Sequence, residues 1–211
     1  MDKGIFITFE GLDGSGKSTQ IDILYRSLKD RSYDVLKTVE PGGTELGQRI
    51  RELLLHNSQF DMDPRTETLL FLASRAELSE KVIRPALAEG KVVISDRFSD
   101  STVVYQGIAR GLGMESIMDL NSWATKTLVP DITFILDIEP RECEKRDLRA
   151  NKSKDRIESE EMDFKHKIHL GYRDIAEKYK ERVMLLDGTA DVGTLSRTIF
   201  KRVLEALDES A

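Results

Sequence analysis

Residues 11–18, Gly-Leu-Asp-Gly-Ser-Gly-Lys-Ser, match the phosphate-binding loop pattern G-x-x-x-x-G-K-[ST] at every fixed position. The apolar run at 5–9 predicts a buried strand before this loop, and residues 19–25 predict a helix after it. Glycines let the backbone wrap around an anion, and a helix N-terminus adds positive potential at the same place. The stretch therefore predicts a strand–loop–helix unit that binds nucleotide phosphates.

Two side chains of this loop have the chemistry that nucleotide phosphates require. The amino group of Lys17 is expected to lie against the outer phosphates, and the hydroxyl group of Ser18 is expected to bind Mg²⁺. A chance glycine turn that binds nothing is the alternative, but the flanking strand and helix argue against it. The sequence therefore predicts a protein that binds a nucleoside triphosphate together with Mg²⁺.

The composition bounds the class of protein. The chain has 211 residues, of which 39% are apolar and 33% are charged, and these proportions suit one core with a soluble surface. Its formal net charge of -6 argues against a nucleic-acid polymer as the main partner, because such proteins usually carry a basic face. A mononucleotide is compatible with this charge, since it needs only a local basic pocket.

Redox and targeting signals favour a cytoplasmic protein. Cys143 is the only cysteine, so no intrachain disulfide can form, which is typical of a reducing compartment. The first residues do not resemble a signal peptide. No apolar run approaches the ~18 residues that a membrane span requires. We therefore expect a cytoplasmic location and no interaction with a membrane.

Five short apolar runs predict strands. They lie at 5–9, 35–39, 92–95, 132–136 and 183–186, and amphipathic helical patterns separate them. Strands that alternate with helices favour a mostly parallel sheet with helices on both faces. Because the sequence shows no linker, repeat or low-complexity segment, we predict a single domain over 1–211. Its expected fold is α/β, with the three layers of the P-loop NTPases.

Charged side chains follow several of these strands. Glu40 follows the second strand, Asp96 and Arg97 close the third, and Asp137 follows the fourth. Ligands of parallel sheets bind at the carboxyl ends of the strands, where the phosphate-binding loop also lies. This edge therefore combines the glycines, acids and arginine that a Mg²⁺-nucleotide site requires, with Asp96 as a candidate Mg²⁺ ligand beside Ser18.

The destination of the γ-phosphoryl group depends on further positive charge. Transfer to a second phosphate needs a second anion pocket that is closed to water, because two phosphate groups repel each other. Arg97 lies at the ligand edge, Arg75 lies one helical turn after Phe71, and Arg51 follows the turn at 41–43. A surface arginine is ordinarily a solvated charge, but the position of Arg97 favours phosphate binding.

A basic segment after the fourth strand is a candidate lid. Its charged side chains are Lys145, Arg146, Arg149, Lys152, Lys154 and Arg156. A helix end followed by an ordinary loop is the alternative interpretation. The polar stretch around 151–155 is typical of a mobile segment, and a mobile basic flap beside a phosphate loop is what lid closure requires. We predict a lid at about 140–160.

Several motifs together resemble the thymidylate kinase family, and its bacterial branch in particular. They lie at 9–20, 40–44, 71–75, 96–107, 130–131 and 155–158, and they read FEGLDGSGKSTQ, EPGGT, FLASR, DRFSDSTVVYQG, PD and DRIE. The resemblance covers nearly the whole chain in the order of the family. Several separate motifs at suitable spacings are far more specific than a phosphate loop alone.

The resemblance implies an ATP-dependent dTMP kinase, a transferase that makes dTDP and ADP with Mg²⁺ in dTTP biosynthesis, and it implies a homodimer. Its implied catalytic residues are Lys17, Asp13, Arg97 and an arginine of the lid. The residues implied to hold the ATP phosphates are Gly11, Leu12, Asp13, Gly14, Ser15, Gly16, Lys17, Ser18 and Thr19.

The same resemblance assigns the residues that hold the base of dTMP. Phe71 is implied to stack on thymine, and Arg75 to donate to its carbonyl edge. Gln106 and Thr102 are implied to contact the base as well. Phe71 could instead be a core aromatic residue, but Arg75 one turn later favours the stacking role.

The phosphate and sugar of dTMP also have implied partners. Arg97 and Arg51 are implied to hold the acceptor phosphate. Asp13 is implied to contact the 3′-hydroxyl group of the sugar or a Mg²⁺-bound water. Tyr105 is implied to lie where a ribose 2′-hydroxyl group would be, which favours deoxyribose, although it too could be a core aromatic residue.

Two departures from the family pattern concern arginines. Many bacterial relatives have an arginine before the Glu-Pro-Gly-Gly-Thr turn, where this chain has Val39, so that a contact is lost or is supplied by Arg49 or Arg51. Some relatives have an arginine after the acid of the phosphate loop, where this chain has Gly14. The arginine that stabilises the transition state should then come from the lid. The candidates, in order of preference, are Arg149, Arg146 and Arg156.

Two other functions are alternatives. One is a switch that hydrolyses its own nucleotide; switches that recognise guanine usually show Asn-Lys-x-Asp, but at 151–155 the acid comes one place late and no strand precedes it. The arginines of the acceptor side also disfavour a switch. A kinase for another acceptor, such as a deoxynucleoside or a different monophosphate, is the closer alternative. Phe71 and Arg75 suit a pyrimidine without settling whether it carries a methyl group.

Overall fold

A computed structural model describes residues 4–56, 62–150 and 155–210 of the chain. Five strands form one sheet: β1 (Ile5–Glu10), β2 (Val35–Val39), β3 (Val92–Asp96), β4 (Ile132–Asp137) and β5 (Val183–Asp187). They lie in the order β2-β3-β1-β4-β5, and every neighbouring pair is parallel. The predicted five-stranded α/β sheet is confirmed. Within the described residues it is wholly parallel rather than mostly parallel.

Helices connect the strands. They are α1 (Lys17–Lys29), α2 (Glu45–Arg51), α3 (Pro64–Leu78), α4 (Arg84–Ala88), α5 (Ser99–Thr102), α6 (Met114–Thr125), α7 (Pro140–Arg149), α8 (Met162–Lys178) and α9 (Val192–Ser210). Wider helical turns continue three of them, namely η1 (Glu52–His56) after α2, η2 (Ser79–Ile83) after α3 and η3 (Val103–Ala109) after α5. Among the described residues, no helix has the length and apolar character needed to cross a membrane.

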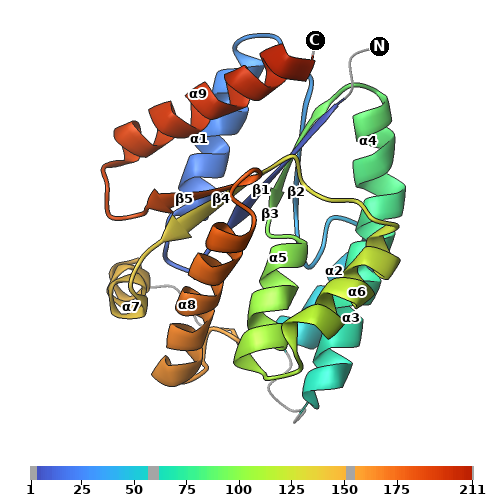
Figure 1. Cartoon of the computed structure of the whole chain (residues 1–211), viewed down its shortest axis with the longest axis vertical. Coiled ribbons are helices and arrows are strands. Elements are labelled where there is room, and N and C mark those ends of the chain that lie inside the picture. Colours follow the sequence, from blue (N-terminus) through green and yellow to red (C-terminus); the bar gives the residue numbers. More distant parts are fainter. Residues whose placement is uncertain (1–3, 57–61, 151–154, 211) are drawn as a thin grey trace.

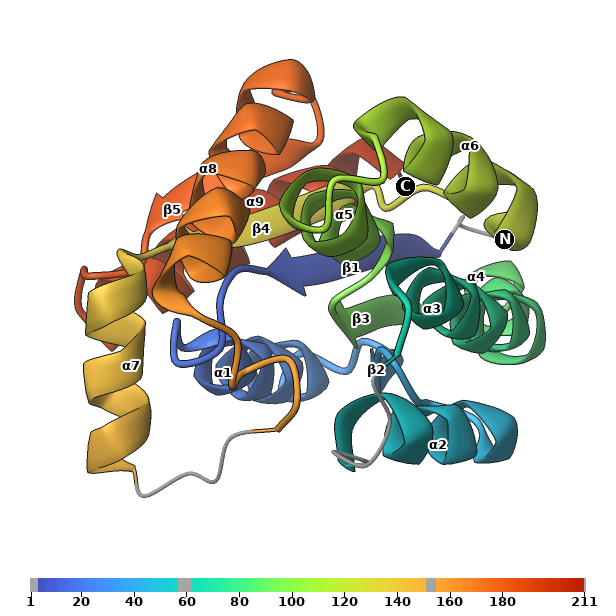
Figure 2. The same ribbon diagram turned by 90° about the horizontal axis from the view of Figure 1, so that it is seen from below.

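Helices cover both faces of the sheet and produce three layers (Figures 1 and 2). On one face α1 and α9 pack against each other and against the sheet, through side chains such as Leu24 and Ile199. On the other face lie α8 and η3, with side chains such as Ile168 and Val104. The helical segment from α3 to α4 contributes Ile83 to a third apolar cluster. The predicted three-layer arrangement is therefore present.

The central strand explains why the apolar runs of the sequence are continuous. Successive side chains of a strand point to opposite faces, so a strand between two helical layers must be apolar on both sides. In β1, Ile7 and Phe9 join the cluster of α1 and α9, whereas Phe6 packs edge-on against Phe98 in the opposite layer. Every residue of β1 is buried.

Local capping determines where several helices begin. The Thr44 hydroxyl group accepts a hydrogen bond from the Gly47 amide at 2.9 Å at the start of α2. The Asp63 carboxylate accepts one from the Arg65 amide at 2.8 Å, and a proline occupies the first position of α3. Pro140 likewise opens α7. Such caps and prolines satisfy or remove amide groups that the first turn of a helix leaves unpaired.

The topology brings the functional motifs to one edge. The phosphate-binding loop connects the carboxyl end of β1 to α1. Glu40 follows β2, and Arg97 follows β3, which is the strand between β2 and β1. Arg97 has a φ of 71°, a left-handed conformation that turns the chain sharply from the strand towards α5. Loop, acid and arginine therefore lie on neighbouring strand ends.

Candidate active site

The phosphate-binding loop requires glycine at several positions. Gly11, Gly14 and Gly16 have φ values of 128°, 78° and 99°, which L side chains rarely adopt. A Cβ atom on Gly11 would lie 2.8 Å from the Leu136 carbonyl oxygen, and one on Gly14 would lie 2.6 Å from that of Cys143. The loop is thus pressed against β4 and α7, and no larger residue fits there.

The loop also presents unpaired amide groups. Within the described residues, the backbone N–H groups of Gly16, Lys17 and Ser18 donate no hydrogen bond. They lie at the N-terminus of α1, which has 13 residues and no side-chain cap. The hydroxyl oxygen of Ser15 is buried without a partner in the same part of the chain. Amides at the positive end of a helix dipole form an anion site, as the loop motif predicts.

Lys17 lies inside this loop rather than in solvent. Its Nζ atom donates to the carbonyl oxygens of Gly11 at 3.0 Å and Leu12 at 2.9 Å, and the Asp13 carboxylate is 3.7 Å away. Burial lowers the pKa of Lys17, and the charge of Arg97 lowers it further, against the opposing effect of Asp13. A phosphate bound at the loop would provide the negative charge that favours the protonated form of this buried amino group.

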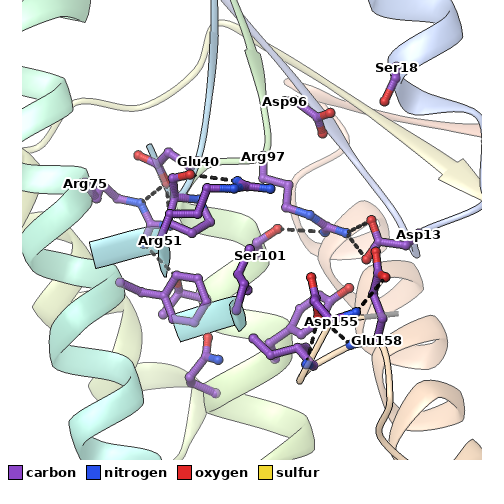
Figure 3. A pocket seen from close by; sticks show the side chains of 17 residues that line it. Asp13, Ser18, Glu40, Arg51, Arg75, Asp96, Arg97, Ser101, Asp155 and Glu158 are labelled. Carbon is purple, nitrogen blue, oxygen red and sulfur yellow. Dashed lines mark hydrogen bonds and ion pairs between the residues drawn. The ribbon is translucent and has the colours of Figure 1, made fainter. Parts of the chain in front are cut away.

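The hydroxyl group of Ser18 and the carboxylate of Asp96 lie at the end of the site where the loop meets β3 (Figure 3). Both are hard oxygen donors of the kind that Mg²⁺ prefers. No group of three or more histidine, cysteine or acidic residues that could hold a metal occurs among the described residues. The arrangement therefore suits an ion that takes most of its ligands from phosphates and water, as Mg²⁺ does in kinases.

A cavity of about 200 Å³ lies beside the loop. Its lining contains ten residues to which the sequence analysis gave a binding or catalytic role: Asp13, Ser18, Arg51, Phe71, Arg75, Asp96, Arg97, Thr102, Tyr105 and Gln106. Figure 3 shows Arg75, Glu40 and Arg51 on one side of the cavity and Asp13 on the other. The tertiary structure thus brings together residues from four separate parts of the sequence.

Arg97 connects the cavity to the phosphate-binding loop. Its Nη2 atom donates to both carboxylate oxygens of Asp13 at 3.0 Å, and the guanidinium lies 5.2 Å from the centre of the Tyr105 ring. Its Nη1 atom lies 3.2 Å from the hydroxyl oxygens of Ser101 and Tyr172. Arg97 is therefore held in place from both sides, at the boundary between the phosphate-binding loop and the cavity.

The sequence analysis did not identify the residues behind Arg97. Glu10, which is fully buried, accepts hydrogen bonds from the hydroxyl groups of Ser101 and Tyr172 at 2.5 and 2.8 Å, and from the Phe98 amide at 2.8 Å. Burial raises the pKa of Glu10, although Arg97 acts against this. An acid that directly precedes the phosphate loop was the available signal for Glu10, but Tyr172 is 162 positions away and only folding reveals it.

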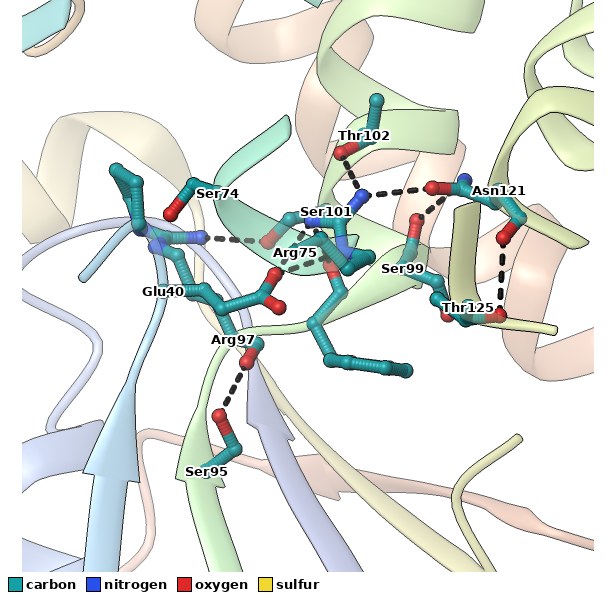
Figure 4. A network of polar contacts seen from close by, with 12 residues as sticks. Glu40, Ser74, Arg75, Ser95, Arg97, Ser99, Ser101, Thr102, Asn121 and Thr125 are labelled. Carbon is teal, nitrogen blue, oxygen red and sulfur yellow. Dashed lines mark hydrogen bonds and ion pairs between the residues drawn. The ribbon is translucent and has the colours of Figure 1, made fainter. Parts of the chain in front are cut away.

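Arg75 makes more hydrogen bonds within the protein than expected. Its guanidinium donates to Glu40, Thr102, Asn121 and the Phe98 carbonyl oxygen, at distances between 2.6 and 3.0 Å (Figure 4). Nη2 also lies 2.6 Å from Glu40 Oε2, so all five N–H groups have protein partners. A direct bond from Arg75 to a base would therefore have to replace one of these contacts.

Glu40 is the partner of Arg75 and is itself only 3% exposed. Burial raises the pKa of Glu40 to about 7, although the neighbouring Arg75 charge works in the opposite direction. Its Oε1 atom is buried and has no hydrogen-bond partner among the described residues. The Glu40–Arg75 pair therefore joins the turn after β2 to α3 at the wall of the cavity.

Of the two arginines on α2, only one faces the cavity. Arg51 lines it and donates to the Pro41 carbonyl oxygen at 2.8 Å. Arg49 is exposed and pairs with Glu45 on the outer surface of α2. Arg51 is thus the residue that can supply positive charge where relatives have an arginine at the Val39 position.

The basic side chains expected to form a lid lie away from the cavity beside the loop. Arg146 donates to the Gly188 carbonyl oxygen at 3.2 Å, and Arg156 pairs with Glu67. Arg149, at the exposed end of α7, contacts no partner among the described residues. None of the three lines the cavity, and Lys152 and Lys154 lie outside the described residues.

The segment after this gap nevertheless reaches the cavity with acids that the sequence analysis did not assign. Asp155 and Glu158 line it beside Asp13, together with Ile157 (Figure 3). Asp155 accepts hydrogen bonds from the amides of Ile157 at 2.8 Å and Glu158 at 2.9 Å. The DRIE motif thus forms a compact turn that approaches the cavity from the side of α7.

Comparisons with known proteins agree with this geometry. The family model described as thymidylate kinase matches residues 9–199. The chain is 46% identical to a thymidylate kinase of Caldanaerobacter subterraneus over 205 residues, which is 97% of each chain. It is 47% identical to one from Thermosipho melanesiensis over 203 residues, covering 96% of this chain and 98% of that one.

A solved structure leads to the same result. The crystal structure of thymidylate kinase from Ehrlichia chaffeensis matches with a TM-score of 0.78 and 35% sequence identity. The match covers 96% of this chain and 99% of the other. Sequence, fold and site therefore agree, and the chain belongs to the thymidylate kinase family.

Proposed function

We propose that this chain transfers the γ-phosphoryl group of ATP to dTMP and so makes dTDP for dTTP biosynthesis. The observation that carries the proposal is the contact between the phosphate-binding loop and the cavity. Asp13 belongs to the loop and also lines the cavity, where Arg97 binds it. Donor and acceptor phosphates would therefore meet at Arg97. We also propose a cytoplasmic location, which the presence of a single cysteine in the sequence supports.

The donor side holds ATP through the loop. The free amides at the start of α1 and the amino group of Lys17 bind its phosphates, and Mg²⁺ is held through Ser18 and Asp96. Mg²⁺ would neutralise charge on the phosphates and fix their orientation. Phosphoryl transfer depends mainly on positioning and charge, which is what this rigid loop supplies.

The acceptor side holds dTMP in the cavity. Phe71 is half-buried on the wall of α3 and offers a face for the base. Thr102 and Gln106 lie one helical turn apart and line the same cavity, so they can meet the edge of a stacked base. Arg75 orients Thr102 through a 2.6 Å hydrogen bond. Arg97 and Arg51 hold the acceptor phosphate.

The alternatives fit the site less well. A switch that hydrolyses its own nucleotide has no use for a cavity with two arginines beside the loop. A kinase for a nucleoside without phosphate would likewise not need these charges at the boundary with the donor. A monophosphate with another base remains the closest competitor, so the decisive experiment compares bases and sugars.

We expect dTMP to be the preferred acceptor, followed by dUMP and then by UMP. A missing methyl group in an apolar pocket costs ~1–3 kcal/mol, so dUMP should be a poor substrate rather than none. UMP adds a hydroxyl group towards Tyr105, which is 8% exposed and packed against Phe164 and Tyr172. The measurement is kcat/KM for the three monophosphates with ATP.

Two variants of Tyr105 provide the control. Tyr105→Phe keeps the ring and should change the dUMP-to-UMP ratio less than Tyr105→Ala, which opens space. If UMP or CMP has a higher kcat/KM than dTMP, the assignment of the acceptor is wrong.

We also propose that the enzyme is a homodimer that buries the outer surface of α2, α3 and α6. Exposed apolar side chains lie on these helices and on η1, which continues α2: Leu46, Leu53, Leu69, Leu120 and Trp123. The helices contact one another in the order α2, α3, α6 and form one side of the molecule (Figure 2). Exposed apolar side chains on adjacent helices are what an interface between two copies would bury.

Trp123 is 82% exposed and should be central to this interface. We expect Trp123→Glu to convert dimer to monomer at micromolar concentration, because the charge would lose its hydration in the interface. Light scattering after size exclusion measures the mass. Val192→Glu, at a 50% exposed apolar site at the start of α9, is the matched control and should leave the mass unchanged. An unaltered mass for Trp123→Glu would place the interface elsewhere.

A further inference from the structure

Glu67 is a buried acid whose role the sequence did not reveal. It lies in the first turn of α3 and is only 1% exposed. Phe71 and Arg75 follow it at intervals of four residues, so all three lie on one stripe of the helix that faces the cavity region. Burying a carboxylate is costly unless several donors satisfy it, so its partners show what it does.

Three side chains donate to this carboxylate. Gln106 Nε2 donates to Oε1 at 2.8 Å, and Arg110 reaches both oxygens at 3.3 Å. Arg156 Nη2 donates to Oε2. Burial by itself would raise the pKa of Glu67, but the hydrogen bonds from Gln106 and Arg156 and the charge of Arg110 outweigh it and hold the pKa below its usual value. Glu67 is therefore ionised near neutral pH and can only accept hydrogen bonds.

This ionised acid fixes the orientation of the Gln106 amide. A glutamine side chain can rotate its amide by half a turn and exchange its donor and acceptor ends. Because Glu67 has no proton to donate, only the NH₂ end of Gln106 can face it. The other end of the amide, the carbonyl oxygen Oε1 of Gln106, makes no bond to Glu67, and among the described residues it has no hydrogen-bond partner. Gln106 is 1% exposed and lines the cavity, so it has little freedom to adopt another position.

We propose that Glu67 is a positioning residue that determines base specificity by holding the Gln106 carbonyl group as an acceptor towards the cavity. This rests on the proposed function, with the base stacked on Phe71. Thymine and uracil carry a hydrogen on ring atom N3, which an acceptor binds. Cytosine has a lone pair at N3, which an acceptor at the same position repels. The enzyme thus selects dTMP and dUMP against dCMP through a residue that does not touch the substrate.

Glu67→Gln tests the proposal because it should reverse the amide. Oε2 of Glu67 accepts from the guanidinium groups of both Arg110 and Arg156, whereas Oε1 accepts from Gln106 and from a single N–H of Arg110. The carbonyl oxygen of the new glutamine should turn towards these cations, and its NH₂ group should turn towards Gln106. Gln106 would then present its own NH₂ group to the cavity, which fits N3 of cytosine.

Glu67→Gln is expected to change the preference for dTMP over dCMP but not the preference for dTMP over dUMP. In Glu67→Gln the ratio of kcat/KM for dTMP over dCMP should fall about tenfold or more, since mismatched buried hydrogen-bonding groups have effects of this size. The ratio for dTMP over dUMP should not change, because both bases present the same N3–H group. A general loss of structure would lower all three values together and leave both ratios unaltered.

Arg110→Gln is the matched control. It removes an ion pair from the same carboxylate but leaves the bond between Glu67 and Gln106, so the dTMP-to-dCMP ratio should stay at the wild-type value. A second test adds Glu67→Gln to a Gln106→Leu background. Because the amide that it reorients is absent there, the second substitution should leave the ratio unchanged.

The outcomes separate this inference from the proposed function. If the wild-type enzyme does not prefer dTMP at all, the proposed function fails. If it prefers dTMP but Glu67→Gln leaves the dTMP-to-dCMP ratio unaltered or raises it, the inference alone is overturned. A fall of that ratio in Arg110→Gln equal to the fall in Glu67→Gln would also overturn it, since the ion pairs and not the amide would then be responsible.

Discussion

Lys17→Ala is expected to lower kcat by at least ~10³-fold, the scale of losing a preorganised charge contact in the transition state. The amino group is 4% exposed and lies among the loop carbonyl oxygens of Gly11 and Leu12, from which it can reach the outer phosphates of ATP. No lysine lines the adjoining cavity among the described residues, so no amine there can replace that of Lys17. The measurement is steady-state formation of dTDP with saturating ATP and dTMP.

Two measurements accompany this variant. Thermal unfolding should show that Lys17→Ala remains folded, because the loop keeps its glycine conformation and its contacts with β4 and α7. Lys29→Ala, at the other end of α1 with its Nζ atom 3.5 Å from Asp34, is the matched control and should retain wild-type kcat. Near-normal turnover in a folded Lys17→Ala protein would remove the loop lysine from the mechanism.

Arg149→Ala is expected to lower kcat by ~10²-fold or more with a small change in the Kd of ATP, as for an arginine that acts mainly in the transition state. Gly14 supplies no charge where some relatives have an arginine, and Lys17 covers only the loop side of the transferring group. Within the part of the chain that the structure describes, Arg149 is the lid candidate that has no partner, and it lies at the end of α7. Its movement to the phosphates would therefore break no contact with the described residues.

The other two candidates allow a direct comparison. Arg146 would have to leave the Gly188 carbonyl oxygen, and Arg156 would have to leave Glu67 and the Leu54 carbonyl oxygen. Arg156→Ala should therefore lower the melting temperature, whereas Arg149→Ala should not. Single-turnover kinetics and ATP binding are measured for all three variants. If the three single variants and the triple variant all keep wild-type kcat, the lid hypothesis is wrong, and the charge must come from Arg97 or from an arginine interpreted as solvated.

Local patterns were sufficient to predict the framework of this protein. Positive φ values at Gly11, Gly14 and Gly16 and continuous apolar strands are encoded by neighbouring residues, so the loop and all five strands could be predicted. The carboxyl ends of parallel strands necessarily share an edge, which is why Asp96 and Arg97 were correctly expected beside the loop. The ten cavity residues predicted from the sequence follow from these two facts and from the family resemblance.

Tertiary contacts decided what those local patterns could not. Arg75 was expected to have donors available for a base, but Glu40, Thr102 and Asn121 converge on it from distant parts of the chain and occupy them. Glu67 looks in the sequence like an ordinary solvated acid of a helix, and only the packing of Gln106, Arg110 and Arg156 around it shows that it is buried.

The physical reason is the range over which each property is determined. Backbone conformation and strand burial depend on a few adjacent residues, so the sequence by itself determined the loop, the sheet and its functional edge. The number of partners of a buried charge depends on residues such as Glu10 and Tyr172, which are 162 positions apart and meet only after folding. Hydrogen-bond saturation and amide orientation were therefore decided by the tertiary structure.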